Sequence, residues 1–448
     1  MSEANTTSQG TPQPTLRRVL GVPDGVAILI GITIGAGIYS TPQIIAGYLP
    51  SFSAIIALWL VVGAFVFVGG LIYAELGTRL PNTGGEYVYM SRCFGPYAGF
   101  MFGWAQLFII RTSPAAGLAI ITVNYLEYFV TLSRFQHTML ALLVIALFGT
   151  LNYIGIHRAS VYQRISTLLK VGGLFFLVAA GLILVGGQEN LLGTRAPSTG
   201  TLGPIGNVVA ALMLVVFSHA GWDRVGYPAE EMKNPRRVIP LSMFLGMAIV
   251  IFLYISANFL YFRTLGIEGL RSSTIVASDV ATELMGPIGA SLIAILVMVS
   301  ATGSINGTMM TAPRAYYAMA KDGLFFKWLN FIHPKYRTPS RAIVAHCIWG
   351  AVILLVRGRF ETIVAGMVFA ILIFYAFTTV ALFKLRRAGG AEDVYRMPFY
   401  PLLPGLYLIG ILALIGFRAF YEWEKSLVDL AFIATGLPFA FFWCRKGK

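Results

Sequence analysis

The stretch Gly31-Ile32-Thr33-Ile34-Gly35-Ala36-Gly37-Ile38-Tyr39-Ser40-Thr41-Pro42 decides how the rest of this sequence is interpreted. It lies in an apolar run, from about Val22 to Gly47, that is long enough to cross a lipid bilayer. Glycine releases the backbone from helical angles and Pro42 lacks a helix donor, so the pattern predicts either a break or close packing through small residues. A break at membrane depth must be enclosed by protein or a watery cavity, because unsatisfied peptide groups in hydrocarbon cost several kcal/mol. This stretch alone leaves both interpretations open.

The composition places the chain among membrane proteins. Of the 448 residues, 57% are hydrophobic and 12% are charged, whereas soluble domains carry about 25% charged residues. About twelve apolar segments reach spanning length. We therefore expect an all-α polytopic protein, multi-pass in the cell membrane, after a polar and disordered tail at residues 1–20.

The net charge of +14 reports topology rather than nucleic-acid binding. Basic residues gather in alternate loops, which is the pattern of cytoplasmic loops. The predicted orientation places both termini in the cytoplasm and gives an even number of spans. The basic set comprises Arg17, Arg18, Arg79, Arg92, Arg158, Arg164, Lys233, Arg236, Arg237, Arg314, Lys321, Lys327, Lys335, Arg337, Arg341, Lys384, Arg386, Arg387, Arg396, Arg445, Lys446 and Lys448.

Neither a cofactor nor a metal is expected. Cys93, Cys347 and Cys444 have irregular spacing that fits no disulfide framework or metal cluster. The sequence also lacks a GxxxxGK[ST] phosphate-binding loop. Enzymatic activity and ATP-driven pumping are therefore not predicted.

A second hydrophobic span is interrupted in the same manner as the first. It reads Phe217-Ser218-His219-Ala220-Gly221-Trp222-Asp223-Arg224-Val225-Gly226-Tyr227-Pro228. Paired interruptions at corresponding places in two halves of a chain indicate a transporter site between inverted repeats. We therefore predict a first five-helix repeat at 21–190, a second, inverted one at 200–388, and helices 11 and 12 with a short cytoplasmic tail at 398–448.

Three further features have alternative explanations. Lys170 could reach the cytoplasmic surface, or its ammonium could contact backbone carbonyls of a broken helix in place of a sodium ion. Arg111 could face the bundle interior or lie near the outer interface. The polar run in helix 8 could serve helix packing or form a wall of the transport pathway; its candidate residues are Ser300, Thr302, Ser304 and Asn306.

At these positions the chain resembles the amino acid–polyamine–organocation superfamily, most of all the L-type amino acid transporter branch with its bacterial members. The similar motifs are Gly35-Ala36-Gly37-Ile38-Tyr39 with Pro42, Phe217 to Trp222 followed by Glu230-Glu231 and Lys233-Asn234-Pro235-Arg236, and Gly303-Ser304-Ile305-Asn306-Gly307. The resemblance implies a leucine-transporter-like fold with two inverted five-helix repeats and two additional helices. It also implies sodium-independent amino acid transport by alternating access.

The resemblance also implies roles for individual residues. The first break would receive the substrate carboxylate, through Ile34, Gly35, Ala36 and Gly37. The second would receive the ammonium, through Phe217, Ser218, His219, Ala220 and Gly221, with Phe217 as the occluding aromatic. Lys170 would stand near the vacant sodium position.

Three residues depart from the family pattern. Ala36 stands where a serine is common, and His219 replaces a tyrosine. His219 could be a core imidazole or could tune selectivity. Asp223 could pair with Arg224 or reach the side-chain end of the substrate.

The predicted function is transport of neutral L-amino acids by exchange. The alternatives are a proton-coupled carrier, a polyamine or cationic amino acid carrier using Asp223 or Glu283, or, from another class, a nutrient receptor or channel. Animal members of the branch bond through an extracellular cysteine to a single-pass glycoprotein. Residues 131–137 contain no cysteine, so we expect no such disulfide-linked partner and a monomer or homodimer.

Overall fold

The described part of the chain is helical. The computed structural model describes residues 16–35, 37–184, 197–200, 203–273, 275–357, 367–389, 392–421 and 423–446. Within these ranges the strand-type pairing is a single bridge between Leu20 and Met232. Because a helix satisfies its own peptide groups, this composition suits a chain surrounded by lipid.

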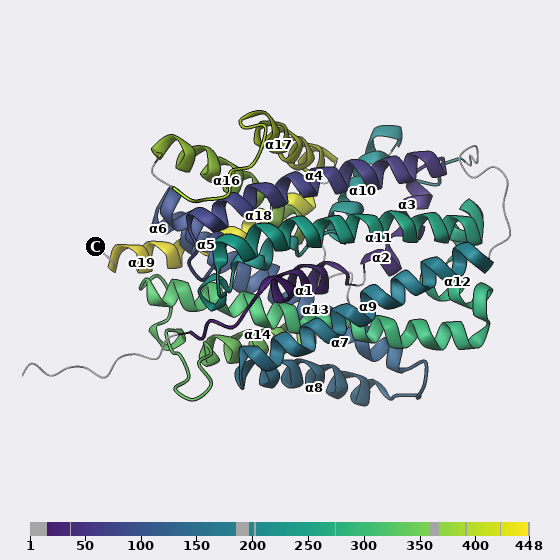
Figure 1. Cartoon of the computed structure of the whole chain (residues 1–448), viewed down its shortest axis with the longest axis horizontal. Coiled ribbons are helices and arrows are strands. Elements are labelled where there is room, and N and C mark those ends of the chain that lie inside the picture. The colour runs from purple at the N-terminus through teal and green to yellow at the C-terminus, as the bar shows by residue number, and fades with distance from the viewer. Residues whose placement is uncertain are drawn as a thin grey trace, which may run out of the picture.

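Long apolar helices form the body of the molecule, and several of them run along its longest axis (Figure 1). They are α4 (Phe52–Arg79), α8 (Arg134–Tyr153), α9 (Ile156–Leu184), α11 (Pro235–Ser272), α13 (Pro287–Lys321), α14 (Ser340–Arg357), α16 (Met367–Ala388) and α17 (Leu402–Tyr421). Of these, α11 is kinked at Gly266, where φ is 65°. Their outward leucine, isoleucine and phenylalanine side chains, such as Leu168 and Ile183, are largely exposed. Such exposure is expected where lipid rather than water is the solvent.

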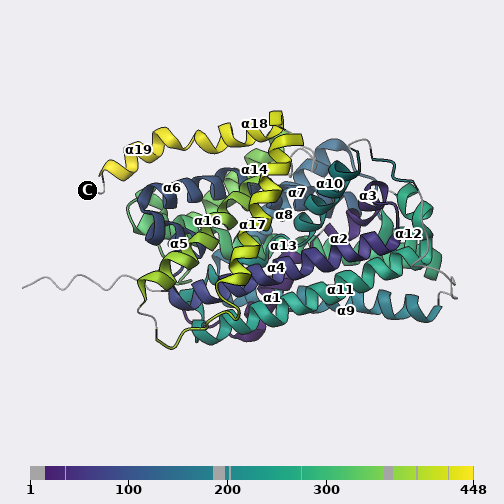
Figure 2. The ribbon, with the colours of Figure 1, turned by 90° about the horizontal axis from the view of Figure 1, so that it is seen from above.

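Ten segments of the described chain are long and apolar enough to cross a membrane. The sequence predicted about twelve, and the difference lies in two places. The helix at 340–356 is shorter than the other candidates. The last predicted span consists of two short helices, α18 (Trp423–Ala434) and α19 (Leu437–Lys446), which lie along one side of the bundle (Figure 2).

The remaining elements are short or interrupted. The first span consists of α1 (Val22–Thr33), α2 (Gly37–Ser40) and α3 (Pro42–Tyr48). A second consists of α10 (Gly203–Ser218), then η3 (Trp222–Gly226) and η4 (Ala229–Glu231). A third joins α6 (Pro96–Ala105) to α7 (Thr112–Leu126) through a π-helical turn, η1 (Gln106–Ile110). The other short elements are α5 (Glu86–Phe94), α12 (Val276–Met285) and η5 (Lys327–Leu329).

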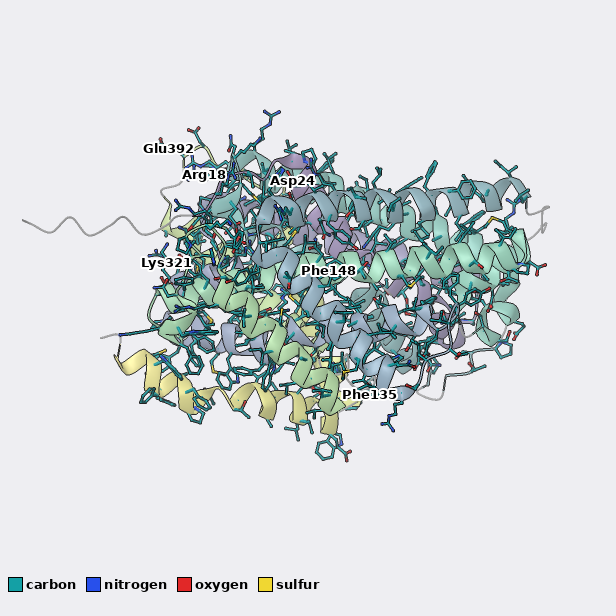
Figure 3. The ribbon with its side chains drawn as sticks, turned by 90° about the horizontal axis from the view of Figure 1, so that it is seen from below. Arg18, Asp24, Phe135, Phe148, Lys321 and Glu392 are labelled. Carbon is teal, nitrogen blue, oxygen red and sulfur yellow. The ribbon has the colours of Figure 1, made fainter. Side chains whose placement is uncertain are left out.

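One end of the bundle carries charged residues and is called the basic end below. Arg18, Lys321 and Glu392 lie there together (Figure 3). The sequence predicts that this end faces the cytoplasm.

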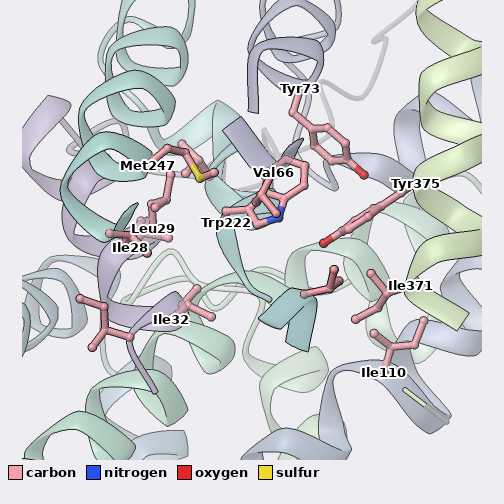
Figure 4. Packing of buried hydrophobic residues seen from close by; sticks show 14 of the residues in the cluster. Ile28, Leu29, Ile32, Val66, Tyr73, Ile110, Trp222, Met247, Ile371 and Tyr375 are labelled. Atoms are coloured by element: carbon pink, nitrogen blue, oxygen red, sulfur yellow. The ribbon is translucent and has the colours of Figure 1, made fainter. Parts of the chain in front are cut away.

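Aromatic packing holds the second break in place. Trp222, just after the break, packs edge-on against Tyr73 of α4 with ring centres 4.8 Å apart, and tilted against Tyr375 of α16 at 5.2 Å (Figure 4). Trp222 is almost completely buried. Edge-to-face pairs of this kind contribute about 0.5–1.5 kcal/mol beyond burial, so η3 is anchored to two neighbouring helices.

Candidate functional site

The first break leaves the last carbonyls of α1 without helical partners, and polar side chains take their place. Helix α1 ends at Thr33, and Ile34 has left the helical conformation with ψ of 80°. Ser300 Oγ donates to the carbonyl of Ile34 at 2.8 Å, and Ser304 Oγ donates to that of Gly31 at 2.9 Å. The break is therefore stabilised by α13. Ala36 lies outside the described residues.

Lys170 contacts the same carbonyls from α9. Its ammonium donates to the carbonyl oxygens of Gly31 at 2.9 Å, Ile34 at 2.9 Å and Ser300 at 3.0 Å. The side chain is completely buried. A cation at the carbonyl end of a helix interacts favourably with the helix dipole. The geometry is that of an ammonium held by backbone oxygens, and the side chain does not reach the protein surface.

The second break begins after Ser218 and turns at Gly221. The φ of Gly221 is +118°, a left-handed value that other residues adopt only with strain. His219 Nδ1 lies 2.9 Å from the carbonyl of Val215. The imidazole packs against Trp59 and Tyr254, with ring centres 5.6 and 5.0 Å away. Its ring thus lies toward α4 and α11, and any contribution of His219 to substrate binding would come from its main chain.

The two breaks touch each other directly. A β-carbon on Gly37 would lie 2.8 Å from Ser218 Cα, and one on Gly221 would lie 2.6 Å from Ile32 Cγ2. Thr41 Oγ1 and Ser218 Oγ are hydrogen-bonded at 2.8 Å. Each glycine is therefore required by a residue of the other broken helix, as real β-carbons do not approach so closely.

Tyr254 of α11 also connects the two breaks. Its hydroxyl lies 2.9 Å from the carbonyl oxygen of Thr33 and 3.0 Å from that of Ser218. A hydroxyl has a single proton, so the two carbonyls compete for one donor.

A cavity of about 60 Å³ lies where the breaks meet. A space of about 10–15 Å³ on this measure holds one water molecule, so the cavity is small but exceeds a single water. Its wall is formed by Ile32, Thr33, Gly35, Gly37, Pro114, Leu118, Phe217, Ser218, Ala220, Arg224, Ser304, Thr308 and Met367. Of the predicted site residues, Gly35, Gly37, Phe217, Ser218, Ala220 and Ser304 line it.

The other predicted wall residues of α13 have different surroundings. Thr302 accepts a hydrogen bond from Tyr162 of α9 at 2.8 Å. Asn306 donates to Gln163 at 2.7 Å and accepts from Asn152 at 2.9 Å. Ser300 lies beside Lys170 at the end of α1. These contacts hold α13 against α8, α9 and α1.

A buried charge cluster lies between η3, α5 and the start of α7. Arg111 donates to both Asp223 and Glu86, the latter at 3.3 Å, and all three side chains are buried. Tyr227 donates to Glu86 at 2.9 Å, and Tyr73 donates to its other oxygen. Arg111 therefore faces the interior, and the partner of Asp223 is Arg111 rather than its neighbour Arg224.

Burial has a strong effect on the acidity of Glu86. Removal from water raises the pKa of this carboxyl to about 8, and the negative charge of Asp223 acts in the same direction. The guanidinium of Arg111 and the tyrosine hydroxyls oppose the rise. Glu86 thus titrates near neutral pH.

Two further ion pairs connect elements at the basic end. Arg314 of α13 donates two hydrogen bonds, of 2.8 and 3.1 Å, to Glu231 of η4, and both side chains are fully buried. Arg386 of α16 donates to Glu75 of α4 in the same two-pronged manner. Burial raises the pKa of Glu231, an effect that Arg314 opposes.

Sequence reasoning missed Arg224 and Thr308 as cavity residues. Arg224 was considered only as a partner for Asp223. A charge inside a predicted span is itself a sign of function, so this signal was present in the sequence. Glu283, an alternative site residue, lies exposed on α12.

Comparison with known proteins identifies the class of protein. The chain matches the family described as "Amino acid permease" over residues 20–434, and it belongs to that family. It is therefore a transporter-type membrane protein rather than an enzyme.

Individual relatives are similar along nearly their whole length. The "Serine/threonine exchanger SteT" of Bacillus subtilis (strain 168) is 28% identical, with 97% of this chain and 98% of the relative covered. The human "b(0,+)-type amino acid transporter 1" is 29% identical, with 98% and 90% covered. The human "Large neutral amino acids transporter small subunit 2" is 28% identical, with 97% and 82% covered. These relatives support amino acid transport as the activity.

Proposed function

We propose that this chain is a sodium-independent secondary transporter that moves L-amino acids across the cell membrane by alternating access. The observation that carries the proposal is the cavity between two helix breaks, each of which presents main chain to it. The N–H groups at the start of a helix segment favour an anion, and the carbonyls at the end of one favour a cation. An α-amino acid carries one group of each kind.

In this proposal the substrate carboxylate meets the main chain between Gly35 and Gly37, and its ammonium meets the carbonyls at the end of α10. Ser218 and Thr33 each present a carbonyl to Tyr254. Since Tyr254 can donate to one carbonyl at a time, the other is available to an ammonium. Phe217, in the cavity wall, would cover the bound substrate.

We further propose that the fold consists of two inverted five-helix repeats followed by two helices, with twelve crossings and both termini in the cytoplasm. The breaks in α1 and α10 support this arrangement, because they occupy corresponding places and contact each other. Paired interrupted helices of this kind place the substrate at the repeat interface.

Lys170 provides the reason to expect sodium independence. Its ammonium occupies a group of carbonyl oxygens at the end of α1, which is the kind of ligand set that transporters use for Na⁺. A fixed positive charge there would replace the ion.

The proposed substrates are neutral rather than cationic. The cavity wall, as far as the described residues form it, contains the guanidinium of Arg224 and no carboxylate. A cationic side chain or a polyamine would meet a like charge without a counter-ion. Exchange is proposed on the strength of the relative named as a serine/threonine exchanger, and the chain would work without a disulfide-linked partner.

Uptake of radiolabelled L-amino acids into proteoliposomes tests the proposal. We expect stereoselective uptake in sodium-free buffer that increases when the vesicles are preloaded with unlabelled amino acid. Protein-free vesicles and D-amino acids are the controls. Absence of uptake for every amino acid would contradict the proposal, and uptake that needs sodium would contradict the role of Lys170.

A further inference from the structure

Arg224 is a buried cation in the wall of the cavity. It lies in η3, directly after the second break, and its side chain is almost completely buried. One guanidinium nitrogen donates to Thr308 Oγ1 of α13 at 2.6 Å. Its Nε has no hydrogen-bond partner within the described structure. The Nε–H group of Arg224 therefore remains available as a hydrogen-bond donor at this side of the cavity.

The nearby carboxylates are engaged elsewhere. Asp223 and Glu86 both accept from Arg111. Among the ion pairs found between described residues, none includes Arg224. The carboxylate of Asp223 interacts electrostatically with Arg224 but forms its ion pair with Arg111. A buried guanidinium with an unused donor is costly, so an arginine in this position indicates that an acceptor group joins it at some stage.

We propose that Arg224 and Thr308 form a subsite for a substrate side-chain carboxylate, so that acidic L-amino acids are carried in addition to neutral ones. The inference rests on the proposed transport function and extends its substrate range. A guanidinium presents several donors in a fork that matches a carboxylate, and the Thr308 hydroxyl adds a donor on the same side.

The spacing along α13 suits this orientation. Ser304 lies at the first break, where the substrate main chain is placed, and lines the same cavity as Thr308. Residues four apart share a helix face and are separated by about 6 Å along the axis. A short acidic side chain could extend over this distance from the main-chain site to Arg224.

The local charge balance supports an anionic ligand. The buried cluster contains two guanidinium groups, Arg111 and Arg224, and two carboxyls, Asp223 and Glu86. Burial raises the pKa of Glu86, which weakens this carboxyl as a countercharge to the two guanidinium groups. A substrate carboxylate at Arg224 would add negative charge beside them.

Near-isosteric substrate pairs test the subsite. The experiment measures how strongly each unlabelled amino acid inhibits labelled uptake into proteoliposomes that contain the wild type or Arg224→Gln. Aspartate is compared with asparagine, and glutamate with glutamine. We expect aspartate or glutamate to compete in the wild type. In Arg224→Gln the apparent affinity for the acidic member should fall, relative to its amide, by about tenfold or more, the effect of one hydrogen bond between charged groups. Thr308→Val, a nearly isosteric change, should shift the same ratio to a smaller degree.

The outcomes separate the two proposals. If the wild type transports neutral amino acids but is not inhibited by either acidic one, the subsite is wrong and the transport function stands. If Arg224→Gln weakens acid and amide equally, Arg224 serves the main-chain carboxylate and the subsite is also wrong. Absence of transport for all amino acids overturns the proposed function itself. Should Arg224→Gln fail to fold, thermal stabilisation of the purified wild type by aspartate but not asparagine supports the subsite, and the reverse result contradicts it.

Discussion

In the proposed transporter, Lys170 takes the place of an ion. Its ammonium has three carbonyl partners at 2.9–3.0 Å and no contact with solvent. The charge is tolerated because the break in α1 supplies free carbonyls, and the break is tolerated because the charge satisfies them. The two features therefore depend on each other.

Replacing Lys170 tests this dependence. Lys170→Ala leaves the carbonyls at the end of α1 without the ammonium, so we expect the initial rate of amino acid uptake to fall about tenfold or more. The ratio of rates between two substrates should stay the same, because Lys170 does not line the cavity. Leu169→Ala, at the neighbouring exposed position, is the matched control and should retain wild-type uptake. Full activity of Lys170→Ala would contradict the role.

The raised pKa of Glu86 predicts that the stability of the folded chain depends on pH. Its pKa rises from the ordinary value of 4.5 to about 8 in the folded chain. The folded state then holds a proton that the unfolded state has released, so the Glu86 contribution to stability decreases as pH rises from about 4.5 to about 8. We expect the thermal unfolding temperature in detergent to fall over this interval, and to fall less in Glu86→Gln, which resembles the protonated form. Equal pH profiles for both proteins would show that Glu86 does not titrate there.

At the scale of elements, the two breaks are fitted to each other through glycine. Gly37 faces Ser218, and Gly221 faces Ile32 while holding a left-handed turn. These contacts leave no room for a β-carbon. The geometry of the cavity thus depends on the absence of a side chain at Gly37 and at Gly221.

Alanine substitutions measure that constraint. Gly37→Ala introduces a methyl group 2.8 Å from the main chain of Ser218, and Gly221→Ala adds backbone strain to a clash with Ile32. We expect each to lower the free energy of unfolding by about 1–3 kcal/mol and to abolish uptake. Gly172 lies in α9 with no atom within 4 Å of a β-carbon. Gly172→Ala should retain uptake and be slightly more stable, because alanine favours a helix interior. Uptake by Gly37→Ala at the rate of Gly172→Ala would contradict the close contact.

The interruptions of α1 and α10 were predictable from sequence because glycine and proline act on their own backbone. The partners of the charged residues were not, since they depend on which helices pack together. Asp223 was considered as a partner of Arg224 or as a contact of the substrate side chain, but its ion pair is with Arg111, directly after the π-helical turn. Glu231 belongs to a polar stretch of sequence, yet it is buried in an ion pair with Arg314. Side chains of α13 such as Thr302 and Asn306 could be recognised as interior, but not as facing α8 and α9 rather than the cavity.

At the scale of the whole molecule, ion pairs join different elements at the basic end. Arg314 and Glu231 connect α13 to the segment after the second break, and Arg386 and Glu75 connect α16 to α4. In the proposed alternating-access cycle the elements of one end separate, so these pairs would belong to the conformation in which the basic end is closed.

Variants that remove one or both members of the Arg314–Glu231 pair separate the cost of an unpaired buried charge from the stability that the pair itself provides. Arg314→Met leaves Glu231 buried without a partner, and we expect a loss of about 3–5 kcal/mol in stability. The double variant Arg314→Met with Glu231→Leu should recover most of this loss, since apolar replacement of a buried pair is often neutral. Thermal unfolding in detergent measures both. If the double variant is as unstable as the single one, the pair itself, rather than the isolated charge, provides the stability.

The contacts of Gly37 with Ser218 and of Gly221 with Ile32 also limit how this chain can evolve. A larger residue at position 37 requires the main chain at 218 to shift, and a larger residue at 221 requires a smaller one at 32 together with a different turn. Variation at either break is therefore tied to positions almost two hundred residues away in the sequence. In a randomised library selected for uptake, changes at the two breaks would be recovered together and rarely alone, so the substrate range of this carrier would change in steps of two residues.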